Sequence, residues 1–205
     1  MGTRHLIPRP PRTWLRNRRR LRHANERHPV PTLTAWEKRQ HLIEWVRRSG
    51  VRVFVETGTY RGETTLALRE VVRRCVTIEL DPALHAGARE IFTGMSDVEL
   101  LHGDSGALIR DVMAGLDEPA LFWLDAHYSG SGTARGIEDS PILGELHSIL
   151  SHRIKEHIVI VDDAREFVGD NGYPTIRRLA KFVEGRGYAI RIRGDLIRIY
   201  AGDDL

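Results

Sequence analysis

Short apolar segments alternate with helical segments along most of this chain, and that alternation constrains the fold more than any other feature. The segments FWL and IVIV lack polar alternation, as central strands buried on both faces do. Strands separated by helices predict an open, mostly parallel α/β sheet that is covered by helices on both faces. The expected strands are residues 51–56, 76–80, 98–102, 120–125 and 157–162. The expected helices are residues 63–75, 82–91, 105–116, 141–150 and 174–184.

The two ends of this alternating region carry local signals of their own. A further helix is expected at residues 34–50, because a Thr-x-x-Glu capping box opens it and a glycine ends it. Its apolar face is expected to carry Trp36, Ile43 and Val46. At the other end, YAIRIRGDLIRIY is typical of two strands joined by a tight turn at residues 194–195. The predicted fold is a Rossmann-like, doubly wound, seven-stranded sheet, mostly parallel with an antiparallel C-terminal hairpin strand.

The charge is distributed unevenly along the chain. Residues 1–30 hold nine arginines and one acidic residue, Glu26, for a charge of +8. Since the whole chain carries +3, residues 31–205 carry 3 − 8 = −5. Residues 1–30 have too few apolar side chains for a packed unit, so we expect a flexible basic arm followed by one domain, residues 31–205. Clustered arginines favour weak contact with an anionic surface, either a membrane or a nucleic acid.

Several simple features bear on the compartment. The chain has no apolar run near the roughly 18 residues of a membrane-spanning helix, and residues 1–30 lack the apolar stretch of a secretory signal. Its single cysteine, Cys75, excludes an intrachain disulfide and fits a reducing compartment. We therefore expect a cytoplasmic protein without a transmembrane segment, and the sequence is compatible with a homo-oligomer.

Acidic residues stand where the predicted strands end. Ligands of such sheets bind at the carboxyl ends of the strands, near the switch point in strand order. Carboxylates repel phosphate, a dinucleotide fingerprint would match only Gly58 of its three glycines, and no phosphate-binding P-loop motif is present. The pattern therefore indicates a ligand without phosphate. The acidic residues are Glu56, Glu79, Asp104, Asp125, Asp162 and Asp163.

With the segment VFVETGTYRG, these strand ends and the terminal hairpin, residues 34–200 resemble the class I S-adenosylmethionine-dependent methyltransferases. The resemblance implies strand order 3-2-1-4-5-7-6 and S-adenosylmethionine (SAM) as the cofactor. It implies that the cofactor binds at the loop of Gly58, Tyr60 and Gly62, where Gly58 lets the backbone approach the methionine portion and Gly62 allows close helix packing. Tyr60 stands in place of a glycine. It further implies that Glu56 holds the amino-acid end and that Glu79 accepts both ribose hydroxyls. Asp104 and Ser105 would then meet the adenine amino group.

The segments LDAHYSG and IVIVDDAR are similar to the metal-dependent O-methyltransferases of the macrocin type. This resemblance implies a divalent cation held by Asp125, Asp162 and Asp163, and three carboxylates suit Mg²⁺ better than zinc. Asp125 would also lie near the point of methyl transfer, and His127 is the candidate base because histidine titrates near neutrality. The implied acceptor is a hydroxyl of a small molecule, activated by the cation and the base.

Other interpretations remain open at this point. The domain could be a cofactor-binding interaction module without catalysis, or a nucleic-acid methyltransferase that uses the arm as its grip. The sequence has DAHY after the fourth strand, where many base-amino methyltransferases carry an Asn/Asp-Pro-Pro-aromatic motif. Asp104 could cap the helix that follows it, Asp163 could cap a turn, and His127 could bond a neighbouring loop.

The composition of the arm leads to a first prediction. Deleting residues 1–30 should change the melting temperature by less than about 2 °C, because the deleted segment offers little apolar surface to bury. Thermal unfolding of the full chain and the truncated chain measures this directly. A drop of more than about 5 °C would mean that the arm packs against the domain or across a dimer.

Overall fold

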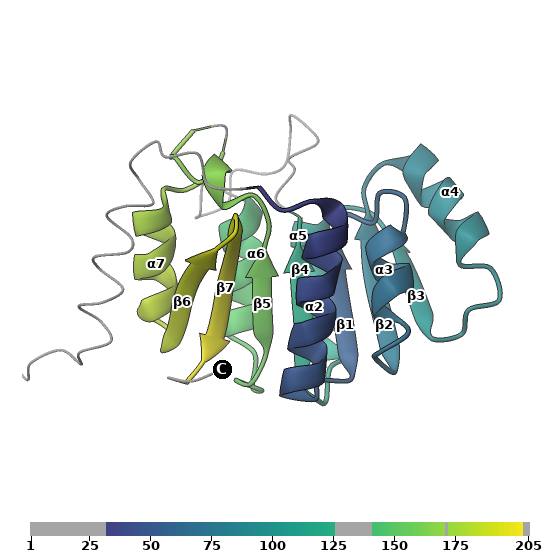
Figure 1. The fold of residues 1–205 in the computed structure, drawn as a ribbon, viewed down its shortest axis with the longest axis horizontal. Helices are drawn as coiled ribbons and strands as arrows, with labels where there is room; N and C mark the ends of the chain where they lie inside the picture. Colours follow the sequence, from purple (N-terminus) through teal and green to yellow (C-terminus); the bar gives the residue numbers. More distant parts are fainter. Residues whose placement is uncertain (1–31, 126–140, 171, 203–205) are drawn as a thin grey trace, which may run out of the picture.

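The computed structural model describes residues 32–125, 141–170 and 172–202. Its centre is a seven-stranded sheet with the order β3-β2-β1-β4-β5-β7-β6 (Figure 1). Strands β1 to β5 run parallel, while β7 pairs antiparallel with both β5 and β6. The predicted fold class and strand order are therefore confirmed. The strands are β1 (Val53–Thr57), β2 (Arg74–Glu79), β3 (Val98–His102), β4 (Ala120–Leu124), β5 (Ile158–Val161), β6 (Tyr188–Arg193) and β7 (Leu196–Ala201).

Helices cover both faces of the sheet (Figure 1). Helices α2 and α3 pack on one face, and α5, α6 and α7 pack on the other. A short 3-10 helix, η1 (Ala164–Glu166), follows β5. The helices are α2 (Ala35–Ser49), α3 (Glu63–Leu68), α4 (Pro82–Ile91), α5 (Ser105–Ala114), α6 (Pro141–Leu150) and α7 (Ile176–Glu184).

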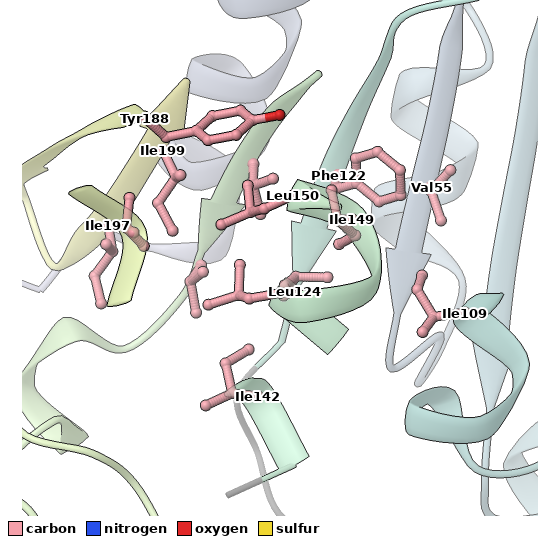
Figure 2. Close-up of a cluster of buried hydrophobic side chains, with 14 of the residues drawn as sticks. Val55, Ile109, Phe122, Leu124, Ile142, Ile149, Leu150, Tyr188, Ile197 and Ile199 are labelled. Carbon is pink, nitrogen blue, oxygen red and sulfur yellow. The ribbon is translucent and has the colours of Figure 1, made fainter. Parts of the chain in front are cut away.

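The core consists of two apolar clusters, one on each face of the sheet. Successive strand residues point to opposite faces, so Val55 joins the larger cluster and Phe54 the smaller one. Figure 2 shows the larger cluster, where Val55 and Phe122 of the sheet meet Ile109 of α5 and Ile149 of α6. Strands β4 and β5 are buried along their whole length, as their continuous apolar runs predict. Each such side chain contributes about 1.5–3 kcal/mol by leaving water, which holds the strand ends in place.

Two local predictions are confirmed in detail. Thr34 and Glu37 form the capping box, with the Glu37 N–H 3.2 Å from the Thr34 hydroxyl and the Thr34 N–H 2.8 Å from a Glu37 carboxylate oxygen. The terminal hairpin turns at Gly194 and Asp195, whose φ angles of 58° and 66° match a two-residue turn with the twist of the strands.

Two other expectations were wrong. Helix α3 ends at Leu68 and not at residue 75, because the amides of Arg73 and Arg74 donate to the Arg52 carbonyl and this segment enters the sheet. Trp36 does not face the core: it is 63% exposed, and Trp45 is buried with Leu42 and Val46 in its place.

Among the residues that the structure describes, no helix combines the length and apolar character that spanning a membrane requires.

Candidate functional site

The candidate site lies at the carboxyl edge of the sheet, where β1 and β4 are neighbours and the chain order reverses. The structure places all the predicted acidic residues at or just beyond the strand ends along this edge. The β1 loop and the end of β4 approach closely: a Cβ atom at Gly58 would lie 3.2 Å from the Cβ atom of Asp125. A side chain at residue 58 would therefore crowd the edge, which explains a glycine there.

The loop after β1 has an unusual backbone. Gly58, Tyr60 and Gly62 all have positive φ angles, of 89°, 50° and 72°. A Cβ atom at Gly62 would lie 2.7 Å from the Phe92 ring, so the glycine lets α3 begin close against the end of α4. Tyr60 stands where the family pattern has a glycine, and its side chain is 58% exposed. The left-handed backbone at Tyr60 is held by its N–H, which donates to a Glu79 carboxylate oxygen at 2.8 Å.

Glu79 joins two loops of the site. One carboxylate oxygen accepts the Tyr60 N–H, and the other accepts the Asp81 N–H at 2.9 Å. The side chain is buried, so these two hydrogen bonds from backbone N–H groups stabilise the carboxylate. Each carboxylate oxygen has a second lone pair, which leaves capacity for further donors.

Glu56 is almost completely buried, with 1% exposure, one strand away from Glu79. One of its carboxylate oxygens accepts hydrogen bonds from the hydroxyls of Thr65 at 2.6 Å and Thr77 at 2.9 Å. Burial raises the pKa of Glu56 to about 7, and the nearby Asp125 charge acts in the same direction. Near neutral pH the carboxyl group of Glu56 therefore holds a proton more readily than an exposed glutamate does.

Asp104 and Ser105 open helix α5 after β3. The Asp104 carboxylate accepts the Gly106 N–H at 2.9 Å, which is the capping role considered for it. The Ser105 hydroxyl donates to Glu145 of α6, a buried carboxyl whose pKa is raised to about 7 by that burial. Sequence reasoning missed Glu145. Its signal was a carboxylate three residues after Ile142, on the buried face of a mostly apolar helix.

Asp125, Asp162 and Asp163 come together as predicted. Each offers a carboxylate oxygen, and these three atoms lie within 4.8 Å of one another. Asp162 and Asp163 are buried, and the Asp163 N–H donates to an Asp162 oxygen at 2.7 Å. Asp163 adopts a left-handed φ of 54° before η1, yet its side chain makes no capping hydrogen bond. The capping alternative therefore does not describe Asp163, and its strained backbone is of a kind that clusters at functional sites.

Two cationic side chains contact this acidic cluster. The Lys38 ammonium lies 2.6 Å from Asp162 Oδ2 and 3.4 Å from Asp163 Oδ1. Arg165 lies 2.8 Å from Asp163 Oδ1 and forms a second ion pair with Asp195 of the hairpin turn. Sequence reasoning missed both cations. Lys38 belongs to no recognisable motif and is 124 residues away from Asp162.

Burial and charge act against each other in this cluster. Burial raises the pKa of Asp162 to about 6, with a contribution from Asp163, although the Lys38 hydrogen bond lowers it. For Lys38, burial favours the neutral amine, but the hydrogen bond and the two negative charges outweigh it and raise the pKa. The pair is therefore ionised at neutral pH.

Two predicted features lie outside the described residues. They are His127, the candidate base, and the basic arm of residues 1–30.

Comparison with known proteins gives a result at the level of the fold. No family model matches the chain, and no curated protein sequence does either. Among solved structures, the SAH-bound methyltransferase from Podospora anserina is 18% identical, with a TM-score of 0.59 and coverage of 99% of this chain and 100% of that one. The SAH complex of an O-methyltransferase from Bacillus cereus is 18% identical, with a TM-score of 0.60 and coverage of 95% and 92%.

A third solved structure is the O-methyltransferase TomG from Streptomyces achromogenes, which acts in tomaymycin synthesis and was solved with SAM. It is 17% identical, with a TM-score of 0.59 and coverage of 89% of each chain. Because the likeness spans nearly whole chains at low identity, it establishes the fold. The chain has the fold of the class I methyltransferases.

The buried carboxyl of Glu145 leads to a second prediction. A folded-state pKa of about 7 against an ordinary value of 4.5 means that the folded protein holds this proton more tightly than the unfolded chain. The contribution of this proton to the free energy of unfolding is thus fully present below pH 4.5. It is lost, by about 3 kcal/mol in total, as the pH rises through 7. In Glu145→Gln, which keeps the acceptor for Ser105, the melting temperature should decline less between pH 5 and 8.

Glu56 titrates in the same pH range, so the variant should reduce the decline without removing it. The control is Glu90→Gln on the exposed surface of α4. Equal pH profiles for Glu145→Gln and the unsubstituted protein would contradict the prediction.

Proposed function

We propose that this protein is a SAM-dependent methyltransferase that transfers a methyl group to a hydroxyl of a small molecule, assisted by a divalent cation. The observation that carries the proposal is the carboxylate-rich edge of a class I methyltransferase fold, centred where Gly58 meets Asp125. SAM carries a cationic sulfonium and no phosphate, so an acidic site of this kind suits it and would repel a nucleotide phosphate.

The described residues fit the parts of SAM one by one. Gly58 has no side chain at the edge, which leaves room for the methionine portion. Glu79 keeps lone pairs for the ribose hydroxyls after accepting two amides, and Glu56 lies beneath the loop as the candidate for the amino-acid end. Asp104 and Ser105 would lie beside the adenine, with Glu145 behind them.

The acidic cluster fits a hard divalent cation. Three carboxylate oxygens within 4.8 Å of one another are ligands that Mg²⁺ accepts. When bound, the cation would supply charge stabilisation to the acceptor oxygen. In the transfer, the acceptor oxygen attacks the methyl carbon, the carbon–sulfur bond breaks, and its electron pair stays on sulfur. We assign the acceptor's proton to His127 and the position nearest the transfer to Asp125.

A nucleic-acid acceptor is the second candidate, because arginines gather on the β6–β7 hairpin. Arg191 and Arg198 lie directly opposite each other, and such like-charged pairs destabilise a sheet. Burial lowers the pKa of Arg198, and so do the charges of Arg193 and Arg48. Within the described part of the chain, Arg48, Arg193 and Arg198 form no ion pair with an acid. A polyanion would relieve this repulsion.

We call Arg48, Arg193 and Arg198 the arginine surface. The described chain begins next to it, just after the basic arm. A Cβ atom at Gly194, in the hairpin turn, would lie 3.2 Å from the Leu33 side chain. The arm and the arginine surface could therefore contact the same polyanion.

The ribose assignment leads to a third prediction. Glu79→Ala should weaken SAM binding by about 2–4 kcal/mol, because it removes charge-assisted hydrogen bonds to two hydroxyls. Isothermal titration with SAM measures this loss. The SAM affinity of Glu79→Gln, which retains one acceptor oxygen, should lie between the affinities of Glu79→Ala and the unsubstituted protein. Melting temperatures separate lost binding from a loosened loop. Unchanged affinity in the Ala variant would refute the ribose assignment.

The cation leads to a fourth prediction. A chelator should abolish methyl transfer to a panel of hydroxyl acceptors, and added Mg²⁺ should restore it, while SAM binding survives both treatments. Asp162→Ala should behave like the chelator, and His127→Ala should slow turnover without loss of bound metal. Full activity in the chelator would remove the cation from the mechanism. SAM binding with no turnover on any acceptor would favour a silent binding module.

The arginine surface leads to a fifth prediction. If a nucleic acid is the acceptor, a labelled RNA should bind at low salt, and Arg193→Gln with Arg198→Gln should weaken this binding several-fold and reduce its dependence on salt. Arg177→Gln, exposed on α7, is the matched control. Binding to anionic vesicles but not to RNA would assign the surface to a membrane, and binding to neither would leave the small-molecule acceptor.

A further inference from the structure

Lys38 reaches the acidic cluster from a distant part of the chain. It lies in the first turn of α2, and its ammonium contacts Asp162 at 2.6 Å and Asp163 at 3.4 Å. Its side chain is only 17% exposed, and these are its two ion pairs among the described residues. A positive charge from the protein itself therefore already lies between two of the three carboxylates assigned to the cation.

We propose that Lys38 is the resident cation of the Asp125–Asp162–Asp163 cluster, and that a divalent cation binds there only by displacing the Lys38 ammonium. This inference rests on the cation of the proposed function. It adds that the chain holds the site closed by its own side chain until metal arrives, so that Lys38 sets the affinity for metal.

The two cations cannot share the site. A bound Mg²⁺ or Mn²⁺ lies about 2.0–2.2 Å from its oxygen ligands. The Lys38 ammonium already contacts Asp162 Oδ2, and Asp162 Oδ1 accepts the Asp163 N–H. A divalent ion beside the ammonium would repel it twice as strongly as a unit charge at the same distance. Because Asp162 and Asp163 are buried, water does little to screen the repulsion.

Of the two basic residues on the cluster, Lys38 is the one that can leave. Arg165 is also tied to Asp195, whose carboxylate accepts the Arg165 N–H at 2.9 Å as well. Arg165 is thus fixed from the far side by the hairpin turn. Lys38 carries a compact charge on a flexible four-carbon stem, and no other carboxylate in the described residues holds it.

Helix α2 does not depend on Lys38 for its own start. The capping box of Thr34 and Glu37 closes its first turn, and Arg39 pairs with Glu63 of α3 at 2.9 Å. Leu42 and Trp45 bury its inner face. The Lys38 side chain can therefore swing away, or be replaced, while the helix stays in place.

The first experiment is a calorimetric titration of the full chain with Mn²⁺. Lys38→Met keeps the length of the side chain without its charge, and should bind Mn²⁺ at least tenfold more tightly than the unsubstituted protein. Lys181→Met, on the exposed surface of α7, is the control and should match the unsubstituted protein. Adding Asp162→Asn to Lys38→Met should abolish the gain. Equal or weaker Mn²⁺ binding by Lys38→Met would overturn the proposal.

The second experiment follows Lys38 itself. Of the 31 lysines and arginines, only Lys38, Lys155 and Lys181 are lysines, so chemical acetylation of amines reports on only three side chains, which peptide mapping separates from any N-terminal amine. In the unsubstituted protein, saturating Mg²⁺ should raise acetylation of Lys38 several-fold and leave Lys155 and Lys181 unchanged. Equal Lys38 acetylation with and without saturating Mg²⁺ would overturn the proposal.

These outcomes separate the proposal from the proposed function. Mn²⁺ binding that Lys38→Met does not improve refutes the role of Lys38 alone. Failure of both proteins to bind Mn²⁺, with SAM binding intact, removes both the cation and the role of Lys38 and leaves the methyltransferase. A gain of Mn²⁺ binding in Lys38→Met without any SAM binding supports the role of Lys38 and refutes the methyltransferase.

Discussion

Mutual repulsion among buried carboxylates is the constraint on which the site depends. A parallel sheet brings the ends of its strands to one edge, and in this chain those ends carry acids that the fold removes from water. Each carboxylate is stabilised differently: Glu79 by two backbone amides, Glu56 by two threonine hydroxyls, Glu145 by Ser105, and the Asp162–Asp163 pair by Lys38 and Arg165. Removing any of these partners would leave a buried carboxyl group without its hydrogen bond or ion pair, which costs more than the contact itself contributes.

The buried strands beneath the site hold these carboxylates in place. Strands β4 and β5 are buried on both faces, and the two apolar clusters fix where they end. The C-terminal hairpin does more than close the sheet. Asp195 in its turn holds Arg165, and Arg165 holds Asp163, so the antiparallel strands support the site at the end of β5. A substitution that disrupts the hairpin turn should therefore also disturb the acidic cluster.

The same sheet presents two surfaces of opposite charge. The carboxyl edge is acidic and suits a cationic cofactor and a cation, whereas the β6–β7 hairpin carries arginines near the entry of the basic arm. In the proposed function, the acidic edge would serve the methyl transfer, and the arginines would serve an anionic acceptor if the acceptor is a nucleic acid. At the acidic edge, Lys38 and Arg165 contact Asp162 and Asp163, so two cationic side chains of the chain itself balance part of the negative charge there.

The sequence by itself determined the alternation of strands and helices, the capping box, the hairpin turn and the acidic strand ends, because periodicity, capping and turn chemistry act between residues that are close in the chain. The strand order was expected only through the resemblance to a known family. The tertiary structure decided the rest. Whether Trp36 or Trp45 faced the core, and that Arg73 and Arg74 join the sheet, depended on what packed or paired alongside. Lys38 had no local signal, and the local signal of Glu145 did not name its partner, because Asp162 and Ser105 lie 124 and 40 residues away from them. Which cationic side chain pairs with which carboxylate depends on the distance between them, and only the folded chain sets that distance.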